Sequence, residues 1–183
     1  MLWLPLALLA AAAWGASNLV DEHLTQTVPK SACILVAISG FFAVVPAGIL
    51  FLLGYITWPG LPMFFLAAAA GIMELLLLYP YFRALTITDA AFVVPLCNMS
   101  TVFTVILAWI FLHETLGGRA YLSIALLVAS ATLASVRKIR GAYPYKACGW
   151  MILAAGIYAV QLLLEKILYD RVPVTMGYGW ILI

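Results

Sequence analysis

The 183-residue chain is 67% hydrophobic and only 9% charged, and its formal net charge at pH 7 is +2. This composition is typical of a polytopic membrane protein and excludes an ordinary soluble globular domain. The net charge is too small to indicate a nucleic-acid partner, and the basic residues do not cluster with aromatic ones.

We predict six membrane-spanning helices, since about 20 apolar residues cross a hydrocarbon core of about 30 Å. They cover residues 2–20, 31–55, 63–85, 90–112, 121–136 and 148–169, and a further apolar segment begins at 178–183. The first segment lacks the basic start of a signal peptide, so we interpret it as an uncleaved helix. Short connections predict antiparallel neighbours, and therefore an all-α membrane bundle.

Two features of the second and fifth segments predict how helices pack. Pro46 predicts a kink, either a moving part or a static bend, because membrane helices tolerate proline where neighbours satisfy the backbone. Ser123 and Ser130 lie two turns apart, and small residues at this spacing let another helix approach closely. We expect this serine face to pack within the bundle or in a homodimer.

The fourth segment is unusually polar for a membrane helix. Its polar residues at i, i+3, i+4 and i+7 share one helix face: Cys97, Ser100, Thr101 and Thr104. Lipid does not favour such a face, whereas protein neighbours or a water-filled cavity do. Pro95 predicts a helix break close to Asn98, whose amide could face that cavity. Hydrogen bonds from Thr101 and Thr104 to their own helix are the simpler interpretation of those two hydroxyls.

An internal repeat relates the first and sixth segments at a shift of 144 residues. Trp14 aligns with Tyr158, Ser17 with Gln161 and Asp21 with Glu165, so aromatic, polar and acidic residues recur on one helix face. An odd number of spans separates the copies, so the second copy is inverted. Inverted repeats are typical of secondary transporters, which bind their substrates at the repeat interface near the midplane.

The third and fourth segments resemble the EamA domain of the drug/metabolite transporter superfamily. The resemblance rests on Tyr81-Phe82-Arg83-Ala84-Leu85, Asp89-Ala90-Ala91 and Phe111-Leu112-His113-Glu114. Where the family often has proline, thirteen residues before this glutamate, the chain has Thr101. The Trp14-Gly-x-Ser-Asn18 cluster is also similar to the family's first helix.

The resemblance implies a chain with one complete five-helix repeat at 1–140 and an incomplete second repeat at 141–183. We therefore expect a truncated ten-helix carrier in the bacterial inner (cytoplasmic) membrane. It would move a small metabolite or export a drug-like compound by alternating access, driven by protons or by exchange. The alternative is a half-size membrane subunit that serves as a binding or scaffold protein, or that transports only as an oligomer.

Glu74 is the main candidate for substrate binding or coupling. It is the acidic residue placed well inside an apolar segment, and intramembrane carboxylates are costly and commonly functional. We expect it either to couple proton movement or to bind a cationic or amine-bearing substrate. The structural alternative is a protonated carboxyl that is hydrogen-bonded to a neighbouring helix, for example to Asn98.

The other candidates are weaker polar or aromatic positions within the spans. They are Trp14, Asn18, Tyr81, Asn98, Thr101, Tyr158 and Gln161. Tyr81 continues the helix face of Glu74, whereas Tyr158 and Gln161 are the repeat counterparts of first-helix positions. Asp21, Asp89, Glu114 and Glu165 lie near span ends, where we expect solvated or capping roles. Tyr79, Tyr81, Trp109 and Trp150 are candidates for interfacial aromatic belts.

No enzyme constellation is evident: there is no nucleophile with a nearby base, no phosphate loop and no histidine-rich ligand set. Cys33, Cys97 and Cys148 lack metal-ligand spacing, and we interpret them as small packing residues. We expect no cofactor and no metal. Charge and resemblance imply opposite orientations. The basic loop 137–146 favours the cytoplasm, which would place the N-terminus outside, whereas the family resemblance implies a cytoplasmic N-terminus.

Overall fold

The fold is described from a computed structural model, which covers residues 3–27, 31–113, 115–137 and 144–183. All regular secondary structure in these ranges is α-helical. The helices are α1 (Trp3–Thr27), α2 (Ala32–Leu52), α3 (Leu61–Leu85), α4 (Ala90–Leu96), α5 (Met99–Leu112), α6 (Gly118–Arg137), α7 (Tyr145–Tyr169) and α8 (Val174–Ile181). Five described spans are long and apolar enough to cross a membrane, with α4 and α5 together forming one of them. The predicted all-α polytopic membrane fold is thus confirmed, but the predicted span at 121–136 falls, within the described residues, on a shorter apolar helix, Gly118–Leu133.

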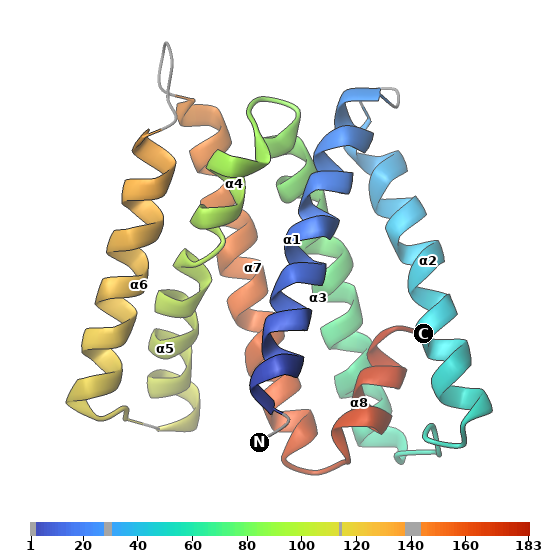
Figure 1. Ribbon diagram of the computed structural model, residues 1–183. Helices are drawn as coiled ribbons and strands as arrows, with labels where there is room; N and C mark the ends of the chain where they lie inside the picture. Colours follow the sequence, from blue (N-terminus) through green and yellow to red (C-terminus); the bar gives the residue numbers. More distant parts are fainter. Residues whose placement is uncertain (1–2, 28–30, 114, 138–143) are drawn as a thin grey trace.

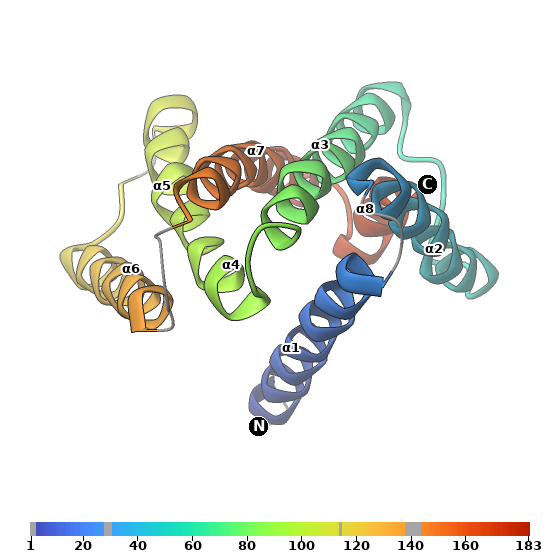
Figure 2. The ribbon, with the colours of Figure 1, turned by 90° about the horizontal axis from the view of Figure 1, so that it is seen from above.

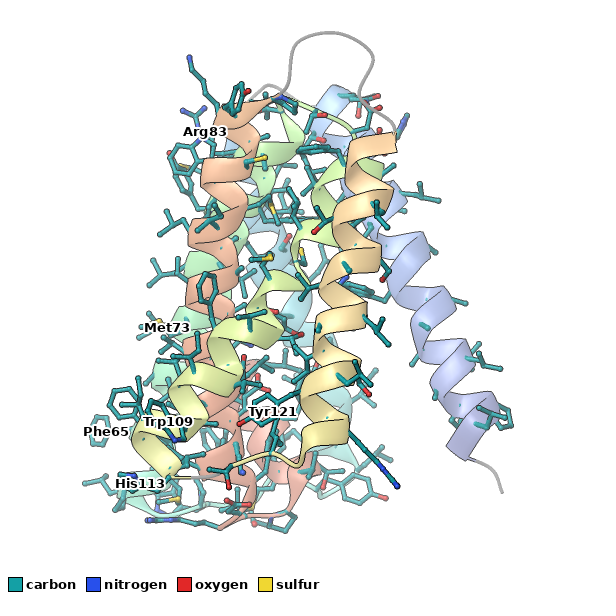
Figure 3. All side chains as sticks on the ribbon, turned by 90° about the vertical axis from the view of Figure 1, so that its left-hand side faces the viewer. Phe65, Met73, Arg83, Trp109, His113 and Tyr121 are labelled. Atoms are coloured by element: carbon teal, nitrogen blue, oxygen red, sulfur yellow. The ribbon has the colours of Figure 1, made fainter. Side chains whose placement is uncertain are left out.

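The long helices alternate in direction along one axis (Figure 1). We call the end at Leu85 and Ala90 the upper end, and the end at Leu112 and Gly118 the lower end. Arg83 lies at the upper end and His113 at the lower end, and the labelled aromatic residues Phe65, Trp109 and Tyr121 lie near the lower end (Figure 3). Helices α1 and α7 run in opposite directions, as an inverted repeat requires.

The predicted break near Pro95 divides the fourth span into α4 and α5. Proline has no N–H group and cannot continue the regular hydrogen-bond ladder of a helix. The amides of Cys97, Asn98, Ser100 and Thr101 each bond to the carbonyl three residues earlier, which tightens the chain into a turn between α4 and α5. By contrast, α2 continues as a helix through Pro46.

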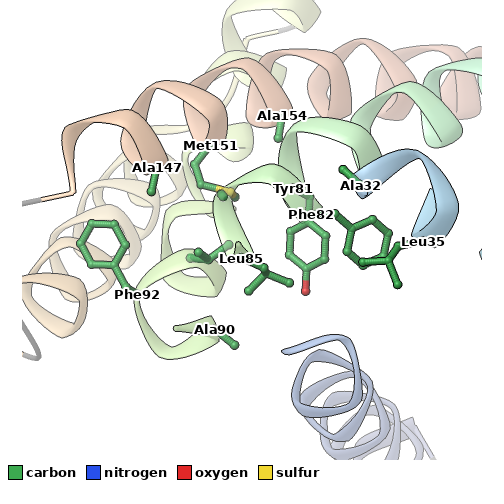
Figure 4. Close-up of a cluster of buried hydrophobic side chains, with 12 residues drawn as sticks. Ala32, Leu35, Tyr81, Phe82, Leu85, Ala90, Phe92, Ala147, Met151 and Ala154 are labelled. Atoms are coloured by element: carbon green, nitrogen blue, oxygen red, sulfur yellow. The ribbon is translucent and has the colours of Figure 1, made fainter. Parts of the chain in front are cut away.

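The main core lies where α3 and α7 pack along their length, the most extensive helix contact in the described chain. Small residues make this contact possible: Ala84, Ala147 and Ala154 are almost completely buried. Phe82, Phe92 and Met151 fill the space around them (Figure 4). Cys97 and Cys148 pack against this cluster, as expected of small apolar residues.

Short helix α8 packs tightly against α2, α3 and α7 in the lower half of the bundle (Figure 1). Three glycines permit the close approach. A side chain at Gly71 would meet the backbone oxygen of Ile181, and side chains at Gly177 and Gly179 would meet Tyr169 and Ile56. The indole Nε1 of Trp180 also donates to the carbonyl of Thr57 at 2.9 Å.

Helix α1 contacts its neighbours mainly through its upper half. Seen from above, it leans away from the bundle toward its start (Figure 2). Leu6 and Leu9 are largely exposed, whereas Leu24 packs against the main core and Thr25 is buried. The upper end of α1 is therefore the part that the protein holds in place.

Some local expectations need correction. Ser123 and Ser130 are exposed and donate to carbonyls of their own helix, so they do not pack within the bundle. Asp89 occupies the N-cap position of α4 but makes no capping bond with its side chain. Glu114 and most of the basic loop 137–146 lie outside the described residues.

Candidate functional site

A first polar cluster joins α1 to α3 near the upper end. The Tyr81 hydroxyl lies 2.9 Å from Asn18 Oδ1 and 3.3 Å from Asp21 Oδ2. Since a phenol has one hydrogen, it donates to one of these oxygens at a time. The Asn18 amide in turn donates to the carbonyl of Trp14 at 2.9 Å. Tyr81 and Asn18 are both buried, so this bond connects the two helices away from solvent.

The burial of Tyr81 corrects the expectation of an interfacial ring, because its hydroxyl points at α1 rather than at lipid headgroups. Trp14, in contrast, is 57% exposed on the outward-leaning part of α1. Asn18 and Asp21 therefore face α3, and Trp14 contributes its backbone carbonyl. Ser17, which the repeat aligns with Gln161, is exposed.

A second polar cluster lies lower, where α3 faces α7. Glu74 is half-buried near the middle of α3, and its carboxylate is close enough to that of Glu165 for the two charges to repel each other. Among the described residues, no hydrogen bond joins Glu74 to Asn98; a protonated Glu74 that bonds to a neighbouring helix stays a prediction. A half-buried carboxylate with a like-charged neighbour requires a proton, a cation or water for compensation.

Gln161 stands beside this carboxylate pair and is only 4% exposed. Its Nε2 donates to Glu165 Oε1 at 2.9 Å, one helical turn along α7. Its Oε1 is buried and has no hydrogen-bond partner. A buried acceptor without a donor is unfavourable, which makes this oxygen a place where a ligand's N–H or O–H group would be accommodated.

Three tyrosines surround the second cluster. Tyr158 and Tyr169 belong to α7 and Tyr178 to α8, and each lies within the electrostatic reach of both Glu74 and Glu165. Helix α8 is therefore part of the surroundings of the cluster, where Ile181 packs closely against Gly71 of α3.

Helix α5 approaches the second cluster from another side. Both α4 and α5 contact α7, and Cys97 packs in one cluster with Met151 of α7, so the helix break lies close to α7. Helices α5 and α7 both run downward (Figure 1). Thr104 follows Cys97 by seven residues, and Glu165 follows Tyr158 by seven residues, so we expect Thr104 at about the height of Glu165. Thr104 Oγ1 is buried without a partner, so the expected bond to its own helix is not formed. Asn98 and Thr101 are half-buried near the break.

The two clusters use one face of α3. Glu74 and Tyr81 are seven residues apart, or about 10 Å along the helix axis. The partners are also related: Asn18 and Asp21 of α1 meet Tyr81, and Gln161 and Glu165 of α7 lie beside Glu74. Two antiparallel helices thus each present an amide and a carboxylate to α3; the 144-residue shift relates the two carboxylates but aligns Gln161 with Ser17, which is exposed, and not with Asn18.

Sequence reasoning assigned Asp21 and Glu165 to span ends and did not include either residue among the site candidates. Both are half-buried and face α3. The signal that could have found them is the repeat itself, since the 144-residue shift aligns these two carboxylates. Tyr178 was also missed, because its segment is too short to be counted as a spanning helix.

A separate open pocket of about 250 Å³ lies beside the helix break. Its lining is almost entirely apolar and comprises Leu96, Met99, Cys148, Met151 and Ile152. Within the described part of the chain, no three or more His, Cys, Asp or Glu residues come together as a metal site.

Comparison with known proteins gives one match. Residues 1–136, about three quarters of the chain, match the EamA-like transporter family. Neither the curated proteins nor the solved structures contain a match. Because the family match covers more than half of a chain built from membrane-spanning helices, this chain belongs to the EamA-like transporter family, a family of membrane transporters.

Proposed function

We propose that this chain is part of a secondary carrier that moves a small solute by alternating access. The observation that supports it best is the relation between α1 and α7. Two antiparallel helices each direct an amide and a carboxylate at α3, and the carboxylates, Asp21 and Glu165, are aligned by the internal repeat. A solute path at an inverted-repeat interface is the arrangement expected of such carriers.

In this proposal, residues 1–140 form a first repeat and residues 141–183 begin a second one. Tilting of one repeat against the other would expose the face of α3 first to one side and then to the other. The upper end of α1, tied to Tyr81, would move with α3, and the turn after Pro95 would accommodate bending between α4 and α5. We place the protein in the bacterial inner membrane as part of the same proposal.

Glu74 is the residue proposed to bind or couple. It lies near the middle of a spanning helix, it has a like-charged neighbour, and its carboxylate lacks a partner among the described side chains. Movement of a proton onto and off this carboxylate would couple transport to a proton gradient, whereas movement of a solute alone would give exchange.

The second candidate function is a binding or scaffold subunit that works as an oligomer. It is favoured by the exposed serine face of α6 and by the exposed lower half of α1, both of which could receive another helix. Small residues in contact across membrane helices are the expected form of such an interface. Cross-linking of cysteines placed at Ser123 in native membranes would reveal a homodimer.

Thiol labelling in a cysteine-free background distinguishes the two functions. A carrier predicts that Glu74→Cys reacts with a membrane-impermeant maleimide from both sides of the membrane, because its site opens alternately. Tyr145→Cys and Leu116→Cys, at opposite ends, should each react from one side only and would also establish the orientation. Ile72→Cys, exposed on the outer face of α3, is the lipid-facing control. Reaction of Glu74→Cys from one side or from neither would contradict alternating access.

A further inference from the structure

We propose that the second polar cluster binds an organic cation with N–H groups, a protonated amine, between the carboxylates of Glu74 and Glu165 with Gln161 Oε1 as an additional acceptor. This substrate class rests on the carrier function proposed above. The inference restricts the solute of the proposed carrier, until now a small molecule of any charge, to a positively charged hydrogen-bond donor.

The first argument is the balance of donors and acceptors. Ionised carboxylates only accept hydrogen bonds, and the one Gln161 donor at hydrogen-bond distance is already used by Glu165. What remains is the Glu74 carboxylate, the free positions on Glu165 and the unpartnered Gln161 Oε1. A primary ammonium supplies three N–H donors and no acceptor, which complements this set.

The second argument is charge. Glu74 and Glu165 repel each other, so an anion would add a third negative group, and a neutral solute would leave the repulsion in place. The backbone oxygen of Ile181 approaches α3 at Gly71, one turn below Glu74, and adds partial negative charge to the same region. A single positive charge between the carboxylates relieves both effects.

The third argument is the aromatic surroundings. Tyr158 of α7 and Tyr178 of α8 lie within electrostatic reach of the carboxylate pair, and both rings are partly exposed at the surface of the described protein. Aromatic faces attract ammonium groups through their quadrupole, and the attraction grows where water is excluded. The surroundings are therefore suited to an amine attached to an apolar body.

Equilibrium binding of radiolabelled benzylamine tests this inference, with the chain in nanodiscs and with empty nanodiscs subtracted. The comparison ligands are benzyl alcohol, which lacks the charge, and benzyltrimethylammonium, which keeps the charge but has no N–H group. The variants are Glu74→Gln, Glu165→Gln and Gln161→Met, with Asp170→Asn as the matched carboxylate control at the exposed end of α7. Circular dichroism and size-exclusion profiles show whether each variant is folded.

We expect benzylamine to bind at least tenfold more tightly than benzyl alcohol, and each Glu→Gln change to weaken it at least tenfold. Gln161→Met should reduce the preference for benzylamine over benzyltrimethylammonium, and Asp170→Asn should change nothing. Absent benzylamine binding, equal binding of the alcohol, or unchanged binding by folded Glu74→Gln and Glu165→Gln proteins would overturn the inference. Saturable benzylamine binding without benzylamine flux into vesicles would support the cation site and reject the carrier function. Flux of another solute that benzylamine does not inhibit would support the carrier function and reject the cation site.

Discussion

The bond between Tyr81 and Asn18 offers a sharp test of how α1 is attached to the bundle. Tyr81→Phe removes the hydroxyl that reaches Asn18 Oδ1 at 2.9 Å and Asp21 Oδ2 at 3.3 Å, and keeps the buried ring. Asn18 still donates to the Trp14 carbonyl, but its Oδ1 loses a buried donor. We therefore predict that α1 separates from α3 more often in the variant.

The free energy lost in Tyr81→Phe can be taken from interhelical hydrogen bonds measured in membranes, which average about 0.6 kcal/mol and reach about 1.7 kcal/mol. The Tyr81–Asn18 bond belongs in the upper part of this range, because both residues are buried and one acceptor is left unpaired. The open population of α1 should rise by a factor between about 3 and about 18.

Hydrogen–deuterium exchange measures this population, because amides in the upper half of α1 exchange when the helix separates. Tyr79→Phe is the matched control on the same helix, because the Tyr79 ring packs edge-on against Trp150 of α7, with the ring centroids 6.0 Å apart. Faster exchange in Tyr81→Phe but not in Tyr79→Phe supports the reasoning. Equal exchange in the wild type and Tyr81→Phe would refute it, as would the same acceleration in both variants.

Three further changes test the packing around the two clusters. Gly71→Ala should lower the thermal midpoint of unfolding and speed amide exchange in α8, because its Cβ would lie 2.5 Å from a backbone oxygen; Gly15→Ala, with open space around it, should not. Thr104→Val should keep or raise the midpoint, since it removes a buried hydroxyl without a partner, and a clear decrease would reveal a partner in the membrane. Trp180→Phe should cost about 1 kcal/mol by breaking the bond to Thr57, and an unchanged midpoint would show that this bond is not formed.

The order of the helices and the extent of five of the six predicted spans could be predicted because bilayer thickness imposes a length on each apolar segment. The break near Pro95 was also predictable, since proline removes a specific backbone donor. The course of α8 was not, because eight residues carry too little apolar signal for a span. Its position depends on the glycines at 71, 177 and 179, whose role becomes visible only when the helices are in contact.

The candidate site was predicted in part. Glu74 stands out in any hydropathy reading, and the repeat drew attention to Tyr158 and Gln161. The partner of Glu74 did not stand out, because Glu165 lies near the end of its span, where charges are ordinarily solvated. Only the antiparallel packing of α3 on α7 shows that this glutamate faces the interior. Sequence alone likewise gave no reason to connect Tyr81 with Asn18, 63 residues away.

The proposed amine carrier is tested most directly by counterflow in proteoliposomes. Vesicles preloaded with unlabelled benzylamine are diluted into labelled benzylamine at mildly acidic pH, with empty liposomes as the control for passive permeation. We predict a transient accumulation of label with the wild-type chain that Asp170→Asn preserves and that Glu74→Gln and Glu165→Gln abolish. If the wild-type vesicles accumulate no more label than empty liposomes, or if Glu74→Gln accumulates as much as the wild type, the proposed role of the Glu74–Glu165 pair is wrong.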